Sequence, residues 1–158
     1  MKKVIYLCMI SLSFLLVLTG CSKKTAVIEG KMEDLMAKLY EGINENDLPA
    51  YLGNITLTDE NLSNYIGTSD IKWKEAIASE SGIGSIAHSV ILIRMDDKAT
   101  SKDIEEAKNK IKESVNPAKW VCVEAEKVYV ESNNNLIVVI MTFEDIADSI
   151  KDNFLNLK

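Results

Sequence analysis

Two uninterrupted apolar runs constrain the fold of this chain most strongly. They are Val90–Ile93 and Leu136–Met141, and both are rich in β-branched residues. Successive side chains of a strand point to opposite faces of a sheet, so a strand without polar alternation is covered on both faces. The sequence therefore predicts strands over about residues 85–95 and 136–141, in a sheet with helices packed on it.

Weaker signals predict the remaining strands. Apolar side chains within residues 120–130 change parity part-way, which predicts a strand with a bulge near residues 126–127. The asparagines at 133–135 suit a turn, so the strands at 120–130 and 136–141 are expected to form a hairpin. Residues 71–79 are ambiguous, and we interpret them as a strand or extended chain.

Apolar residues at helical spacing predict four helices. The expected helices run from 32 to about 44–47, and over about 58–66, 100–115 and 142–157. Thr58 and Thr100 are candidate N-terminal caps, and Gly67 is a candidate terminator of the second helix. The sequence thus predicts one α+β domain over residues 31–158, with an antiparallel-rich sheet of three or four strands.

The first twenty residues have the pattern of a secretion signal. A basic head, Met1–Lys3, precedes an apolar stretch, Val4–Leu18, and a small-residue exit. As a helix this stretch would span only ~22 Å, short of the ~30 Å that a membrane-spanning segment needs. Residues 1–20 are therefore predicted to be a signal rather than a membrane span.

The exit of this signal, Leu18-Thr19-Gly20-Cys21, resembles a lipobox, the maturation site of bacterial lipoproteins. The resemblance implies cleavage before Cys21 and a diacylglyceryl group on its sulfur, so that residues 21–30 form a lipid-anchored tether. Two acyl chains make a stable anchor. We therefore expect the protein on the extracytoplasmic face of the cell membrane, attached through Cys21.

Charge and cysteine content restrict the mature protein further. Loss of Lys2 and Lys3 changes the formal charge from −6 to −8, which argues against a nucleic-acid partner because Lys and Arg carry phosphate binding. Once Cys8 leaves with the signal and Cys21 is lipidated, Cys122 has no partner for an internal disulfide. Its apolar neighbours predict a buried strand residue.

Candidate nucleophile and cofactor motifs are weak. His88 is the sole histidine, and Ser85 and Ser89 lie near it, but no nucleophile elbow surrounds them. We interpret His88 as a strand residue with an ordinary hydrogen bond. Residues 82–87 match the GxGxxA dinucleotide fingerprint, but a strand is expected after them where the fingerprint needs a helix.

The candidate acidic sites are no stronger. Glu124 and Glu126 would share one face of a strand, roughly 7 Å apart, a separation found in glycoside hydrolases. Their position beside Lys127 favours a solvated face. A turn and a helix start explain the aspartates that could bind calcium, which are Asp96, Asp97 and Asp103. We expect no catalytic residue, no metal and no cofactor.

The arrangement of strands and helices is similar to that of a family of uncharacterised bacterial lipoproteins, domain of unknown function 4358. The resemblance runs from about Met32 to Phe154 and rests on the strand 89–93, the charged helix 103–112, the strand pair 120–130 and 136–141, and the closing segment 145–154. It implies an exported, lipid-anchored domain. It supplies no activity, ligand or catalytic residue.

The sequence is compatible with two functions. The favoured one is a non-enzymatic module of the cell envelope that binds a protein, peptide or small ligand. The alternative is an envelope hydrolase acting on wall or peptide substrates through dispersed carboxylates or through a serine with His88. A deep polar cleft would favour an enzyme or a ligand binder, and an exposed apolar patch would favour a protein partner.

Overall fold

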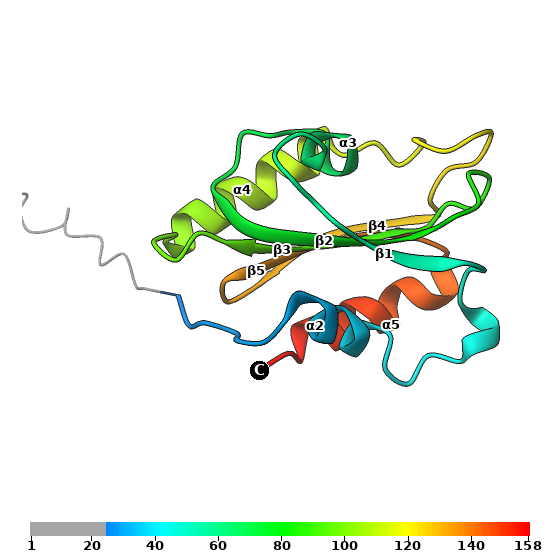
Figure 1. Cartoon of the computed structure of the whole chain (residues 1–158), viewed down its shortest axis with the longest axis horizontal. Helices are drawn as coiled ribbons and strands as arrows, with labels where there is room; N and C mark the ends of the chain where they lie inside the picture. Colours follow the sequence, from blue (N-terminus) through cyan, green and yellow to red (C-terminus); the bar gives the residue numbers. More distant parts are fainter. Residues whose placement is uncertain (1–24) are drawn as a thin grey trace, which may run out of the picture.

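The computed structural model describes residues 25–158. The predicted signal over residues 1–20 and the predicted lipidation site Cys21 lie outside the described residues. The described chain is α+β, with a five-stranded antiparallel sheet in the order β1-β2-β3-β5-β4. Helices α3 and α4 cover one face of the sheet and α2 and α5 cover the other (Figure 1).

The strands are β1 Leu52–Thr56, β2 Trp73–Ser81, β3 Ser89–Met95, β4 Lys127–Asn133 and β5 Leu136–Thr142. The helices are α2 Met32–Leu39, α3 Leu62–Ile66, α4 Ser101–Ser114 and α5 Glu144–Leu155, with a short 3₁₀ turn η2 at Glu45–Asp47. The α+β class, the antiparallel sheet and the strand within residues 71–79 are confirmed. The expected count of three or four strands is wrong, because β1 adds a fifth.

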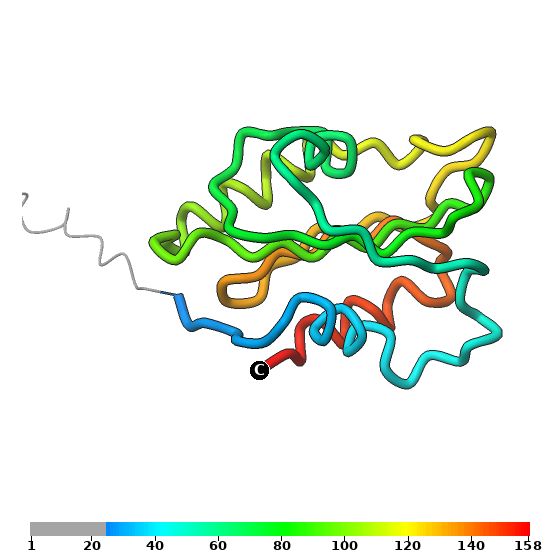
Figure 2. Tube along the Cα trace, in the orientation of Figure 1, coloured from blue at the N-terminus to red at the C-terminus, as the bar shows by residue number. Residues whose placement is uncertain are grey.

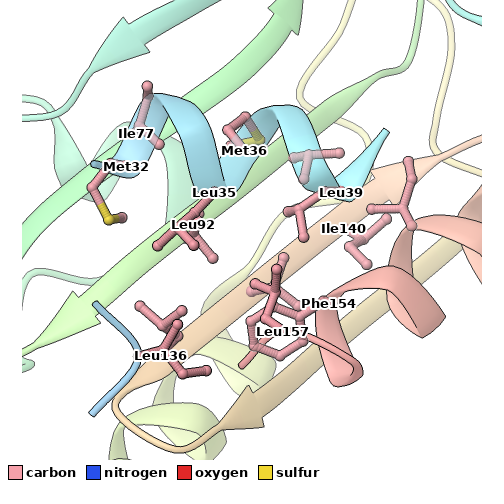
Figure 3. Packing of buried hydrophobic residues seen from close by; sticks show 14 of the residues in the cluster. Met32, Leu35, Met36, Leu39, Ile77, Leu92, Leu136, Ile140, Phe154 and Leu157 are labelled. Carbon is pink, nitrogen blue, oxygen red and sulfur yellow. The ribbon is translucent and has the colours of Figure 1, made fainter. Parts of the chain in front are cut away.

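The two apolar runs lie at the centre of the sheet, as their pattern predicts. Every residue of β3 and of β5 is buried. Figure 3 shows the α2–α5 face of these strands, where Leu35, Leu92, Ile140 and Phe154 pack together. On the α3–α4 face, the side chains of opposite parity pack against the helices.

The predicted strand over residues 120–130 is wrong in its first half. β4 begins only at Lys127, and Cys122 has a φ of 60°, which an extended strand does not allow. The backbone of this segment bonds to loops instead of the sheet: Val121 N–H donates to the Gly84 carbonyl and Ala125 N–H donates to the Pro117 carbonyl. A connection, rather than a bulged strand, therefore carries the chain from α4 to β4.

Helix ends follow local chemistry. Thr100 caps α4, as the sequence predicts, and it forms a full capping box with Asp103. Gly67 ends α3 in the left-handed region, with a φ of 76°. Thr58 does not cap α3; its backbone N–H instead donates a hydrogen bond to Asn61 Oδ1.

The tube in Figure 2 shows the N-terminal part of the described chain and the C-terminal helix on the same side of the sheet. The N-terminal segment is held by two hydrogen bonds: Arg94 donates to the Gly30 carbonyl at 2.7 Å, and Ile28 N–H donates to Asn135 Oδ1 at 2.8 Å. Within residues 25–158, no helix has the length and apolar character needed to cross a bilayer.

Candidate functional site

The two edges of the sheet differ in the chemistry that they present. At the β4 edge, Lys127 forms an ion pair with Glu144, and the Tyr129 hydroxyl donates to Asp148 at 2.8 Å. Lys151 lies over the Tyr129 ring, 4.4 Å from its centre. Charged side chains on an edge strand oppose the pairing of another chain, so the β4 edge is protected.

The β1 edge has no such protection. Residues 48–58, which contain β1, carry no charge in a chain whose residues are 27% charged. Four of the five β1 residues are exposed, and the apolar side chain of Ile55 is 38% exposed. Tyr51, directly before β1, is 80% exposed and has a φ of 56°. An uncharged strand on the outside of a sheet offers its backbone groups to an incoming chain.

Hydrogen bonds at the two ends of β1 fix the direction of its backbone groups. Leu57 N–H donates to the Ala76 carbonyl, and Gly82 N–H donates to the Tyr51 carbonyl. In an antiparallel pair, hydrogen-bonded residues alternate along the strand. The backbone N–H and carbonyl groups of residues 51, 53, 55 and 57 therefore point toward β2. Those of Leu52, Asn54 and Thr56 point away from the sheet.

The side chains of these three residues share the α2–α5 face. Directly opposite residues project on the same face of an antiparallel pair, and Thr56 lies opposite Ile77, a residue of the α2–α5 core. Beside Leu52 and Asn54 this face contains a pocket of about 290 Å³. Its lining consists of Met36, Ala37, Tyr40, Leu48, Leu52, Asn54 and Ser79. The pocket is therefore mainly apolar, with a few polar groups, as is common in ligand sites.

A buried polar chain supports this pocket from behind. The Tyr40 hydroxyl lies 2.9 Å from His88 Nε2, and His88 Nδ1 lies 2.6 Å from the Thr142 hydroxyl. Burial lowers the pKa of His88 to about 4 and raises the pKa of Tyr40, a rise that a hydrogen bond with Ser79 partly offsets. His88 is thus neutral at physiological pH, and both of its ring nitrogens have partners.

A second cluster lies on the α3–α4 face around Lys119. Its ammonium pairs with Glu80, and both side chains are mostly buried, at 18% and 19% exposure. The ammonium also lies 4.7 Å from the centre of the Tyr65 ring, 5.2 Å from that of Trp120, and 3.3 Å from the Ser89 hydroxyl. Because these groups satisfy one another, the cluster serves to fix the 119–126 connection against β2 and α3.

The structure separates the serine candidates from an accessible site. His88 and Ser89 are both fully buried, and Ser85 lies on the exposed loop between β2 and β3. The two partners of the His88 ring are Tyr40 and Thr142, and neither serine bonds to it. His88 makes hydrogen bonds as predicted, but it lies just before β3 and not in the strand where the sequence placed it.

Cys122 is exposed, so the prediction of a buried thiol is wrong. Its apolar neighbours do not lie in a strand: Val121 is 68% exposed on the connection before β4. Glu124 and Glu126 lie on the same connection instead of on one strand face, and Glu126 accepts the backbone N–H of Glu144 at 2.9 Å. Their predicted separation along a strand therefore does not apply.

The other motifs lie where local structure explains them. Asp96 accepts the Lys98 N–H in a turn, Asp97 pairs with Lys74, and Asp103 belongs to the α4 capping box. Within residues 25–158, no group of three or more acidic, histidine or cysteine side chains could hold a metal ion. Residues 82–87 connect β2 to β3 and precede no helix.

Comparison with protein-family models gives no match, and comparisons with curated proteins and with solved structures give no significant match. The resemblance to the lipoprotein family therefore stays a prediction. The unprotected β1 edge and the pocket beside it are the features of the described residues best suited to hold a partner. Sequence reasoning missed both, although the uncharged run over residues 48–58 was a visible signal.

Proposed function

We propose that this protein is a lipid-anchored binding module of the cell envelope that captures an extended segment of another polypeptide. The segment adds to the sheet as a sixth strand beside β1. Its backbone bonds to the outward N–H and carbonyl groups of Leu52, Asn54 and Thr56, and these bonds supply affinity with little dependence on sequence.

The contrast between the two edges of the sheet is the observation that carries this proposal. Natural sheets protect their edges with charge, and this chain does so at β4 but not at β1. A protein that leaves an uncharged edge open risks pairing with itself or with other chains. A partner that binds this edge gives that exposure a function.

The alternative hydrolase has less support. Nucleophilic catalysis needs a hydroxyl that substrate can reach and a base beside it. Ser89 is fully buried, and its hydroxyl lies near Lys119, whose ammonium is paired with Glu80. His88 is also buried and has two other partners. None of these observations favours hydrolysis, so we propose the non-enzymatic function.

The anchor belongs to the same proposal. A diacylglyceryl group on Cys21 would hold the domain at the extracytoplasmic face of the membrane, as members of the lipoprotein family that it resembles are held. Mass spectrometry of the protein from its native membrane should find a lipid mass on Cys21, and Cys21→Ala should lose it. Detection of native mature protein with an unmodified Cys21 would disprove the anchor.

Panning a phage-displayed library of random nine-residue peptides on the full chain tests strand capture. We expect enrichment of uncharged peptides with apolar residues at alternate positions. Ile55→Lys should abolish the enrichment, because it places a charge on the open edge. Val128→Lys is the matched control: Val128 is 37% exposed on β4 and shares the α3–α4 face with Ile55, because each lies opposite a residue of that core.

The control variant should select the same peptides as the unmodified protein. Equal loss in both variants would show that added charge, rather than the β1 edge, controls the selection. Failure of the unmodified protein to retain phage above a surface without protein would overturn strand capture.

A further inference from the structure

We infer that the captured segment is an uncharged peptide with an apolar side chain opposite Asn54. This side chain has the size of leucine, methionine or phenylalanine, and it enters the pocket beside β1. This inference rests on the proposed strand capture. It identifies the class of peptide that the edge selects.

Backbone geometry places one side chain of an added strand at the pocket. Asn54 has its N–H and carbonyl directed outward, so an antiparallel neighbour places a hydrogen-bonded residue directly opposite it. That residue projects on the same face as Asn54, the α2–α5 face. Adjacent strands lie about 4.8 Å apart, so its side chain reaches the α2–α5 face where Leu52 and Asn54 line the pocket.

The chemistry of the pocket selects an apolar side chain. Met36, Leu48 and Leu52 supply apolar surface around a volume of about 290 Å³. The Tyr40 hydroxyl at the pocket is already hydrogen-bonded to His88. A charged side chain would lose its hydration there without finding an opposite charge in the lining. An apolar side chain is stabilised by leaving water.

A second copy of this chain suits the pocket poorly. A two-fold pairing of β1 with itself centred on Asn54 places Asn54 opposite its own copy and Thr56 opposite Leu52. The pocket would then receive short polar side chains. The outward groups of β1 can form such a pair, but the apolar lining would remain unfilled, so a peptide of different sequence fits better.

Two synthetic peptides test the inference on the full chain in detergent micelles. Each has nine residues, all threonine except the central one, which is leucine in the first and alanine in the second. Chemical-shift titration of the backbone amides gives both dissociation constants. We expect the leucine peptide to bind about tenfold or more tightly, because it buries about three more carbon groups.

A pocket-filling variant, Ala37→Leu, provides the matched comparison. Ala37 is an exposed residue of α2, and leucine is a good helix former. The new side chain should occupy part of the pocket and leave the backbone of β1 unchanged. We expect the preference for the leucine peptide over the alanine peptide to fall to near onefold in this variant.

The possible results separate the inference from the proposed function. Equal binding of both peptides to the unmodified protein, with shifts at β1, overturns the pocket and leaves strand capture intact. Failure of both peptides to bind overturns strand capture itself. Self-association that Asn54→Pro abolishes would make a second copy the occupant and overturn the peptide assignment.

Discussion

Because the protein contains a single histidine, the pH dependence of its stability isolates one buried group. Burial lowers the pKa of His88 from 6.5 to about 4. Between these two pH values the imidazole is protonated in the unfolded chain and neutral in the folded one. The stability that neutral His88 contributes is fully present above pH 6.5 and is lost as the pH falls toward 4. These two pKa values predict a loss of about 2.5 kcal/mol between pH 7.5 and pH 4.5.

The carboxylates with lowered pKa values affect stability at a lower pH than His88 does. Hydrogen bonds lower the pKa values of Asp70, Asp103 and Asp148 below their usual 3.8, so the stability that these carboxylates contribute is lost below about pH 4. The slope between pH 4.5 and pH 6.5 is therefore assigned to His88.

Urea unfolding followed by tryptophan fluorescence measures the free energy of unfolding at each pH. His88→Gln is the matched variant, because its amide keeps a donor and an acceptor for Tyr40 and Thr142. It should cost about 0.5–1.5 kcal/mol at pH 7.5. Its stability should hardly change down to pH 4.5. An unmodified protein with a flat profile, or a variant with the same slope, would refute the burial argument.

Three further predictions concern packing, ion pairing and thiol exposure. Gly67→Ala should destabilise the fold by about 2 kcal/mol or more in thermal melts, because its φ is 76° and an added Cβ would lie 2.0 Å from a backbone oxygen of α4. Gly84→Ala is the control: an added Cβ there meets nothing within 4 Å, so the stability should change by less than about 0.5 kcal/mol. Lys119→Ala should lower the free energy of unfolding in urea by about 1–3 kcal/mol, because it leaves the mostly buried carboxylate of Glu80 without its partner. Lys102→Ala removes an exposed ion pair and should lower it by less than about 0.5 kcal/mol. Equal losses in the two variants would contradict the role of burial. Native protein should lose one rapidly labelled thiol on Cys122→Ser, and slow labelling of that thiol before unfolding would contradict its exposure.

The sequence predicts the centre of the sheet well because burial leaves a strong pattern. An unbroken run such as Val90–Ile93 has few solutions other than a strand covered on both faces. The capping box at Thr100 and the stop at Gly67 are equally local, since each depends on a few neighbouring residues. The fold class therefore follows from short segments.

The edges and connections were harder to predict because their structure depends on distant partners. β1 is exposed and shows no apolar alternation, so the pattern that reveals a half-buried strand is absent. Conversely, residues 121–123 have strand-like composition, but backbone bonds to Gly84 and Pro117 anchor the connection on either side of Cys122. Local preference could not reveal those contacts.

The candidate site was missed for the same reason. Its outward backbone groups are defined by the register of β1 on β2, which no local pattern records. Its pocket brings α2, the segment before β1, and β2 together, from Met36 to Ser79. The absence of charge over residues 48–58 was the one signal in the sequence, and it acquires meaning only once the strand is known to lie at an edge.

Residue-resolved amide hydrogen exchange of β1 tests strand capture most directly. In the free protein, the amides of Leu52, Asn54 and Thr56 should exchange rapidly, whereas those of Gly53 and Ile55 should be protected by β2. Addition of the leucine-centred peptide should protect all five. Strand capture would be contradicted if the three outward amides stayed unprotected at saturating peptide, or if protection arose at β4 instead.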